Sequence, residues 1–133
     1  MGVVNNARYF EYFEAGGNDF LRKLDYPYTI LEKENIGLPV IEAYAKYISG
    51  AKYDDVLTIK TTLLTIPTVR FKINYEITCK DILIAEGYTV HSFVNFIKMK
   101  PVRPPEKFIE IIKSKFWNQL NYYRHFNKTE AER

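Results

Sequence analysis

Residues Asn5 to Leu24 read NNARYFEYFEAGGNDFLRKL, and this stretch decides the fold. Its apolar residues recur at intervals of three and four, a spacing that places side chains on one face of an α-helix. A helix with one apolar face needs another element to cover that face, so we expect it to pack against the core. The residues on the expected apolar face are Phe10, Phe13, Gly17, Phe20, Leu21 and Leu24.

Both the start and the middle of this helix carry residues that need an explanation. Asn5 and Asn6 precede the periodic part, where an N-cap belongs, and the backbone N–H groups exposed there can hold an anion or polarise a carbonyl oxygen. The alternative is that the two asparagines only cap the helix. Gly16 and Gly17 each cost about 1 kcal/mol of helix stability relative to alanine, so we expect a strand or a partner's helix to approach closely, or else a kink.

The rest of the chain alternates apolar and polar residues with a period of two, which is typical of strands. We expect the Lys80–Asp81 pair to form a tight hairpin turn and Gly87 to bend its strand or mark a bulge. In the first strand, Ile41, Ala43, Ala45 and Tyr47 are expected to point to one face, and Glu42, Tyr44 and Lys46 to the other. The expected strands are Val40–Ile48, Val56–Thr65, Thr68–Cys79 and Ile82–Ile97.

Helical segments are expected on both sides of these strands. Thr29–Asn35 is predicted to form one or two turns closed by Gly37, and Pro105 is well suited to start a second long helix. The polar and aromatic tail is predicted to continue that helix through Tyr123 and Phe126. The pattern favours an α+β fold in which a curved antiparallel sheet wraps a central helix. We assign residues 1–117 to one domain and 118–133 to a C-terminal extension.

Composition excludes several classes of protein. The net charge is only +3 and no block of Lys or Arg occurs, which argues against a nucleic-acid-binding protein. Cys79 is the single cysteine and there are two histidines, so neither an internal disulfide nor a structural zinc site is expected. No apolar run approaches the roughly 20 residues of a membrane span, and the N-terminus does not read as a signal peptide. We therefore expect a cytoplasmic protein.

Four stretches carry a resemblance to a known family. They are the loop and helix start Gly2–Glu14, the helix end Phe20–Leu24, the turn Lys52–Asp55, and Ala85–Gly87 in the last long strand. In this order and spacing the chain resembles the hotdog-fold acyl-CoA thioesterases of the 4-hydroxybenzoyl-CoA thioesterase type. The resemblance covers roughly residues 2–116 and implies a hotdog fold and hydrolysis of acyl-CoA to a free acid and coenzyme A.

The resemblance also implies partners and site residues. Two sheets would join edge to edge in a homodimer, or in a dimer of dimers as a homotetramer, and the acyl-CoA substrate would bind at the subunit interface. The backbone N–H of Asn6 would polarise the thioester carbonyl, and the entry loop and helix start would contact the substrate. No metal or redox cofactor is implied, because coenzyme A is part of the substrate. The substrate-contacting positions are Gly2, Val3, Asn5 and Tyr9.

The chain departs from the family pattern in three ways. An aspartate three residues before the motif glycine acts as nucleophile or general base in the family, and that position would precede Met1. We expect that this aspartate and most of the first strand lie upstream of a shortened chain, the alternative being that the protein has lost them. Many relatives carry a histidine where this chain has Asn6, and few carry so long a tail after Trp117.

Other side chains have both a functional and a structural interpretation. Glu14, the nearest carboxylate on the helix, could orient a water, although a structural or dimer-contact role is favoured. Arg70 and Lys72 could meet coenzyme A phosphates at the dimer groove, or form a solvated face. His91 is expected to be a satisfied interior or interface histidine, and Cys79 to be inert.

Two rival functions follow from the same residues. The first is a non-catalytic hotdog protein that binds acyl thioesters or serves as an assembly subunit, which the absent aspartate motivates. The second, a hotdog dehydratase or hydratase, is disfavoured because Asn5–Asn6 offers no histidine for an aspartate–histidine pair. Acyl chain length, and coenzyme A versus acyl carrier protein as the carrier, stay open.

Overall fold

The computed structural model describes residues 7–49, 56–116 and 121–127. The order of elements is helix, short helix, strands, helix and strand, in agreement with the expected α+β class. The helices are α1 (Ala7–Lys23), α2 (Tyr28–Lys33) and α3 (Glu106–Phe116). The strands are β1 (Ile36–Gly37), β2 (Val40–Tyr47), β3 (Val56–Thr62), β4 (Arg70–Cys79), β5 (Ile82–Ser92), β6 (Val94–Asn95), β7 (Lys100–Pro101) and β8 (Asn121–Asn127).

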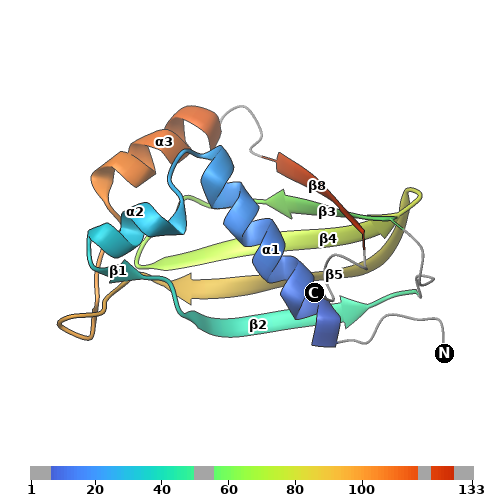
Figure 1. Ribbon diagram of the computed structural model, residues 1–133, viewed down its shortest axis with the longest axis horizontal. Helices are drawn as coiled ribbons and strands as arrows, with labels where there is room; N and C mark the ends of the chain where they lie inside the picture. Colours follow the sequence, from blue (N-terminus) through green and yellow to red (C-terminus); the bar gives the residue numbers. More distant parts are fainter. Residues whose placement is uncertain (1–6, 50–55, 117–120, 128–133) are drawn as a thin grey trace.

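A five-stranded antiparallel sheet in the order β2-β5-β4-β3-β8 forms the main layer, and α1 runs diagonally across one of its faces (Figure 1). A small three-stranded sheet, β1-β6-β7, lies at one end together with α2 and α3 (Figure 1). The main core lies between α1 and the sheet. This is the predicted arrangement of a central helix covered by a curved sheet.

The apolar face of α1 is rotated slightly from the one predicted. Tyr9 and Tyr12 are buried together with Phe13, whereas Phe10 is 42% exposed and not a core residue. The predicted face does not include the tyrosines, yet their rings bury a large apolar area. Phe10 instead packs its ring against Phe13, with centroids 6.0 Å apart, at the margin of the core.

The close approach expected at the two helix glycines is confirmed. A Cβ atom on Gly16 would lie 3.1 Å from side-chain atoms of Ile59 and Thr61 on β3. A Cβ atom on Gly17 would lie 2.9 Å from the hydroxyl oxygen of Tyr75 on β4. The two glycines therefore let α1 settle closely onto the middle of the sheet.

The alternation of apolar and polar residues predicted the central strands correctly. The predictions for the turns and strand ends were less accurate. Lys80 and Asp81 both have positive φ, 51° and 64°, as the tight hairpin between β4 and β5 requires. Asn35, with φ 63°, and not Gly37, takes the left-handed position after α2. Strand β5 ends at Ser92 instead of running on to Ile97, and β6 follows as a separate short strand.

Gly87 has a different role from the one predicted. The register shift between β4 and β5 lies at Ile77/Thr78, so Gly87 is not a bulge in that pair. A Cβ on Gly87 would lie 2.0 Å from the carbonyl oxygen of Tyr44 and 2.8 Å from the Phe13 ring. Gly87 is thus the point where β2, β5 and α1 come closest together.

The predicted strand Val40–Ile48 is confirmed as β2, and most of its side chains are exposed. Val40, Ile41 and Tyr44 are 55%, 48% and 47% exposed, although their strand is paired along its length with β5. The reason is position, because β2 is an edge strand of the sheet and α1 crosses it near one end, where the ring centroids of Tyr9 and Tyr47 lie 6.0 Å apart (Figure 1). The alternating pattern identified a strand correctly but could not distinguish a covered face from an open one.

The prediction for the tail was wrong. Residues 121–127 do not extend α3; they form β8, which pairs antiparallel with the whole of β3. The segment NYYRHFN is rich in aromatic residues, which favour strands, and its pairing satisfies backbone groups that β3 would otherwise leave open. The tail therefore contributes an edge strand to the main sheet.

Helix α3 closes the end of the core that lies farthest from the start of α1. Phe108 is fully buried, with ring centroids 5.3 Å from Tyr26, 5.6 Å from Phe71 and 5.6 Å from Phe93. Such aromatic packing stabilises the fold beyond the area that it buries. Phe71, one of these rings, also lines a pocket between α1 and the sheet.

Candidate functional site

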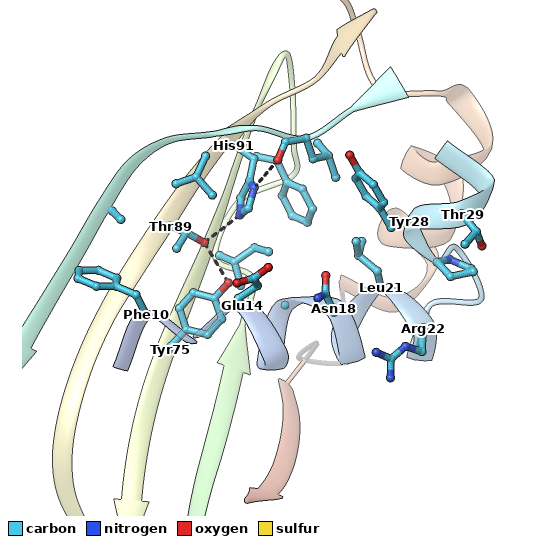
Figure 2. Close-up of a pocket in the computed structure, with 17 residues that line it drawn as sticks. Phe10, Glu14, Asn18, Leu21, Arg22, Tyr28, Thr29, Tyr75, Thr89 and His91 are labelled. Atoms are coloured by element: carbon cyan, nitrogen blue, oxygen red, sulfur yellow. Dashed lines mark hydrogen bonds between the residues drawn. The ribbon is translucent and has the colours of Figure 1, made fainter. Parts of the chain in front are cut away.

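An open pocket of about 740 Å³ lies between α1, the start of α2 and the sheet (Figure 2). Its wall on α1 carries Phe10, Glu14, Asn18 and Leu21, which recur every three or four residues along one side of the helix. Its floor is formed by alternate residues of β4 and β5 together with part of β2. The floor residues are Val40, Ala43, Phe71, Ile73, Tyr75, Thr89 and His91.

A chain of hydrogen bonds crosses this floor from β4 to the end of the loop before β2. The Tyr75 hydroxyl oxygen lies 2.9 Å from Thr89 Oγ1, which lies 3.0 Å from His91 Nε2 (Figure 2). His91 Nδ1 is 3.0 Å from the carbonyl oxygen of Leu38. Each of the three side chains in this series of hydrogen bonds thus has a polar partner, which is what partly or fully buried polar groups need.

The direction of every bond in the chain follows from its last acceptor. A carbonyl oxygen can only accept, so the Leu38 contact requires a hydrogen on Nδ1 of His91. In the neutral ring Nε2 is then the acceptor, so Thr89 donates to it, and the Tyr75 hydroxyl must donate to Thr89. The hydrogen of Tyr75 is therefore directed toward Thr89, and only lone pairs of its oxygen remain for another partner.

Burial keeps the hydrogen-bonded side chains of His91 and Tyr75 uncharged. Desolvation lowers the pKa of His91, although its hydrogen bond to the Leu38 carbonyl acts in the opposite direction. Desolvation also raises the pKa of Tyr75 and the negative charge of Glu14 raises it further, while the hydrogen bond between Tyr75 and Thr89 acts in the opposite direction. At neutral pH the floor therefore presents a neutral imidazole and a neutral phenol.

Glu14 and Arg22 bring charge to the α1 side of the pocket. Glu14 is exposed and its carboxylate lies toward the Tyr75 hydroxyl (Figure 2). Arg22 Nη1 lies 2.5 Å from Oδ1 of the buried Asp19, so part of its charge is already paired. Glu14 is the only carboxylate among the residues that line the pocket in the described part of the chain.

Comparisons with known proteins agree with this geometry. The sequence model of the thioesterase-like superfamily matches residues 1–112. The chain belongs to the thioesterase-like superfamily. It is 27% identical over 107 residues to the acyl-CoA thioesterase YbgC of Haemophilus influenzae, covering 80% of this chain and 79% of that one. It is 31% identical over 65 residues to the 4-hydroxybenzoyl-CoA thioesterase of a Pseudomonas species, covering 47% and 46% of the two chains.

Solved structures place the chain in the same superfamily. A DHNA-CoA thioesterase from Staphylococcus aureus superposes with a TM-score of 0.80 at 27% identity, covering 89% of this chain and 81% of that one. The hotdog fold and the family resemblance predicted from the sequence are therefore confirmed. The matched region of the family model ends before β8, so this strand lies outside it.

The predicted site residues fall into four groups. Gly2, Val3, Asn5 and Asn6 lie outside the described residues, and their roles stay predictions. Glu14 lines the pocket. Tyr9 is buried in the core between Tyr12 and Tyr47 and does not line the pocket.

Arg70 and Lys72 do not reach the pocket. Both are exposed and alternate along β4 with Phe71 and Ile73, which form the pocket floor, so they lie on the opposite face of the sheet. The Lys72 ammonium stands 4.2 Å from the ring centroid of Tyr88. The structure thus supports the solvated-face interpretation of these residues within this subunit, and a contact with coenzyme A phosphates stays a prediction.

Sequence reasoning missed Tyr75 and Thr89. His91 was interpreted as a satisfied histidine, which its two hydrogen bonds confirm. The spacing Thr89–His91 places both side chains on one face of β5, which was a usable signal. Their meeting with Tyr75 depends on the register of β4 against β5, in which Ile73 lies opposite Thr89 and Phe71 opposite His91.

Among the residues that the structure describes, no group of three or more His, Cys, Asp or Glu side chains is arranged to hold a metal ion. None of the described helices is long and apolar enough to cross a membrane.

Proposed function

We propose that the protein hydrolyses acyl-CoA thioesters to the free acid and coenzyme A, with the acyl group in the pocket between α1 and the sheet. The observation that carries the proposal is the position of Glu14 in a thioesterase-family fold. It is the one carboxylate lining a mostly apolar pocket of about 740 Å³ in the described residues. Family membership and the thioesterase names of its relatives support the same reaction.

The chemistry requires a base, a polarised carbonyl and a leaving thiolate. Glu14 would accept a proton from a water molecule, whose oxygen then attacks the thioester carbonyl carbon. The C–S bond breaks in the tetrahedral intermediate, and the released thiolate of coenzyme A takes up a proton. The predicted backbone N–H at the start of α1 would stabilise the developing oxyanion. Glu14 would thus take the role of base that the resemblance assigns to an aspartate.

The decisive experiment is thiol release from a panel of acyl-CoA esters by the wild-type protein, Glu14→Gln and Glu11→Gln. Glu11 lies one turn earlier on α1, is exposed and pairs with Arg8 at 3.1 Å, so its variant is a matched control. Loss of a general base lowers the rate about 10²–10⁴-fold. We expect this loss in Glu14→Gln and wild-type rates in Glu11→Gln.

Three other outcomes have distinct meanings. Equal activity of the two variants would refute the role of Glu14 and leave the hydrolase assignment intact. Binding of acyl-CoA without hydrolysis by the wild type would favour the non-catalytic acyl-thioester-binding or assembly protein. Hydrolysis of acyl groups on acyl carrier protein but not on coenzyme A would change the carrier and keep the reaction.

We infer that the protein acts as a homodimer joined through β2. This strand is the outer strand of the five-stranded sheet, and Val40 and Ile41 are about half exposed on it, at 55% and 48%. An open apolar strand edge is a surface for pairing with a second copy. Ile41→Lys should convert the dimer to monomer in light scattering, and a wild-type protein that is already monomeric would contradict the inference.

A tetramer built from two such dimers is a second assembly that the same light-scattering measurement would reveal. The cytoplasmic location and the absence of a metal or redox cofactor also stay predictions. Cell fractionation checks the location, and activity after treatment with a chelator checks the cofactor.

A further inference from the structure

The floor of the pocket combines an apolar lining with one hydrogen-bonding point whose polarity is set by the protein. Phe71 and Ile73 line the floor beside Tyr75, and Val40 and Ala43 extend the apolar surface on β2. Tyr75 itself is held in place, because its ring stacks on Phe13 with centroids 4.6 Å apart and planes at 7°. Its hydroxyl oxygen therefore occupies a defined position beside Gly17, in the interior of α1.

We propose that Tyr75 selects the acyl group: its hydroxyl accepts a hydrogen bond from an O–H or N–H group on an otherwise apolar, uncharged acyl chain. Thr89 and His91 are positioning residues, which direct the Tyr75 hydrogen away from the substrate. This inference rests on the proposed thioesterase function and adds the class of acyl group. The arrangement that carries it is the chain from Tyr75 through Thr89 and His91 to the Leu38 carbonyl.

The direction of these hydrogen bonds determines which acyl groups are favoured. Because Tyr75 donates its only hydrogen to Thr89, a substrate group next to its oxygen is stabilised only if it brings a hydrogen of its own. A methyl group in the same place makes no hydrogen bond, and a carboxylate meets the lone pairs of an acceptor. The side chain of Glu14 on the same side of the pocket adds negative charge that further disfavours an anionic acyl group (Figure 2).

The surrounding apolar side chains increase the free-energy difference between acyl groups that can form this hydrogen bond and those that cannot. A polar group that enters a site with few other polar partners must find a hydrogen bond there or lose its hydration without compensation. The other ionisable groups that line the pocket are Glu14 and Arg22 on α1 and Tyr28 on α2. Of these, only Glu14 interacts electrostatically with the Tyr75 hydroxyl.

The test compares acyl-CoA pairs that differ only by a hydroxyl in place of a methyl group. The probes are 4-hydroxybenzoyl-CoA against 4-methylbenzoyl-CoA, and a series of ω-hydroxyacyl-CoA esters against alkanoyl-CoA esters of matched length. One hydrogen bond is worth about a tenfold change in an equilibrium or rate. We therefore expect the wild type to prefer the hydroxyl member of at least one pair by about tenfold in kcat/KM.

Four variants separate selection from general damage. Tyr75→Phe removes the acceptor and should bring the preference to within about twofold, whereas Tyr88→Phe, a tyrosine that does not line the pocket, should keep it. Thr89→Val keeps the phenol but frees its hydrogen, so the preference should also collapse. Thr89→Ser restores a hydroxyl at the same position and should restore the preference.

The ratio between paired substrates is a readout that a purely structural role would not change. A preference of about tenfold that survives in both Tyr75→Phe and Thr89→Val, or a wild type without any preference, would overturn the inference. If no ester is hydrolysed, the proposed function fails separately. The same pairs are then compared by calorimetric binding, where the expected ratio and the variants that abolish it are unchanged.

Discussion

Replacing Gly17 by alanine tests the contact between α1 and the pocket floor. A Cβ at this position would lie 2.9 Å from the Tyr75 hydroxyl oxygen, closer than such atoms approach without movement, and 3.7 Å from Ile73 Cδ1, an ordinary contact. Tyr75 cannot turn aside easily, because its ring stacks on Phe13 and its hydroxyl bonds to Thr89. The substitution therefore forces a shift of the helix or of the tyrosine.

The expected magnitude combines two opposing terms. Exchanging glycine for alanine inside a helix stabilises it by about 1 kcal/mol, whereas an added methyl group in a packed site costs about 1–3 kcal/mol. We therefore expect Gly17→Ala to change the free energy of unfolding by between about 0 and 2 kcal/mol in the destabilising direction. Removing the hydroxyl with Tyr75→Phe eliminates the obstacle, because the nearest remaining ring atom, Cζ, is 4.0 Å away.

A double-mutant cycle measured by urea unfolding isolates the contact. Tyr75→Phe alone should cost about 1 kcal/mol for its hydrogen bond to Thr89. In that background Gly17→Ala should stabilise by about 1 kcal/mol, which gives a coupling of about 1–3 kcal/mol between the sites. Protein concentration must be equal throughout, since an associating protein has concentration-dependent stability. A Gly17→Ala protein more stable than wild type, with no coupling, would refute the reasoning.

Three further changes probe other parts of the fold. Asp81→Gly should raise the free energy of unfolding, measured in urea, by up to about 1 kcal/mol, because Asp81 has a φ of 64° that glycine adopts without a steric cost. Phe108→Ala should lower thermal stability by about 3–5 kcal/mol, since it empties a fully buried site among three aromatic rings; a loss below about 1 kcal/mol would show that α3 does not close the core. Burial lowers the folded-state pKa of His91 below 6.5, so the unfolded chain binds the proton more tightly and stability should fall as the pH drops below 6.5. Unfolding curves of wild type and His91→Gln measured from pH 7 to pH 5 should differ in slope, and parallel curves would contradict this.

The elements that sequence reasoning predicted best are those whose pattern depends on local physics. Alternation in β4 and the apolar period of α1 are properties of a single segment in contact with one core. The close approach at Gly16 and Gly17 was predictable as well, because two glycines in mid-helix lower stability unless the space is needed. Residues 121–127 were predicted as helix because their strand conformation depends on pairing with the edge of β3, which lies far away in the sequence.

The pocket shows why a site is harder to predict than a fold. Glu14 was noticed because it lies on the recognisable helix, whereas Tyr75 and Thr89 looked like ordinary strand residues. Their hydrogen bonds depend on the register of two strands and on a carbonyl oxygen at Leu38, 53 residues from His91. A single sequence contains the period of each strand but not the alignment of one strand against the next.

The close contacts at Gly17 and Gly87 differ in which amino-acid replacements they allow. At Gly17 the obstacle is the hydroxyl of one side chain, so a second substitution elsewhere can make room for a larger residue. At Gly87 the nearest atom is the main-chain carbonyl oxygen of Tyr44, only 2.0 Å from the Cβ position. Every amino acid carries that carbonyl, so no exchange at residue 44 can remove it. Laboratory evolution starting from this sequence should therefore find compensated replacements of Gly17, while Gly87 stays glycine as long as β2 remains beside β5.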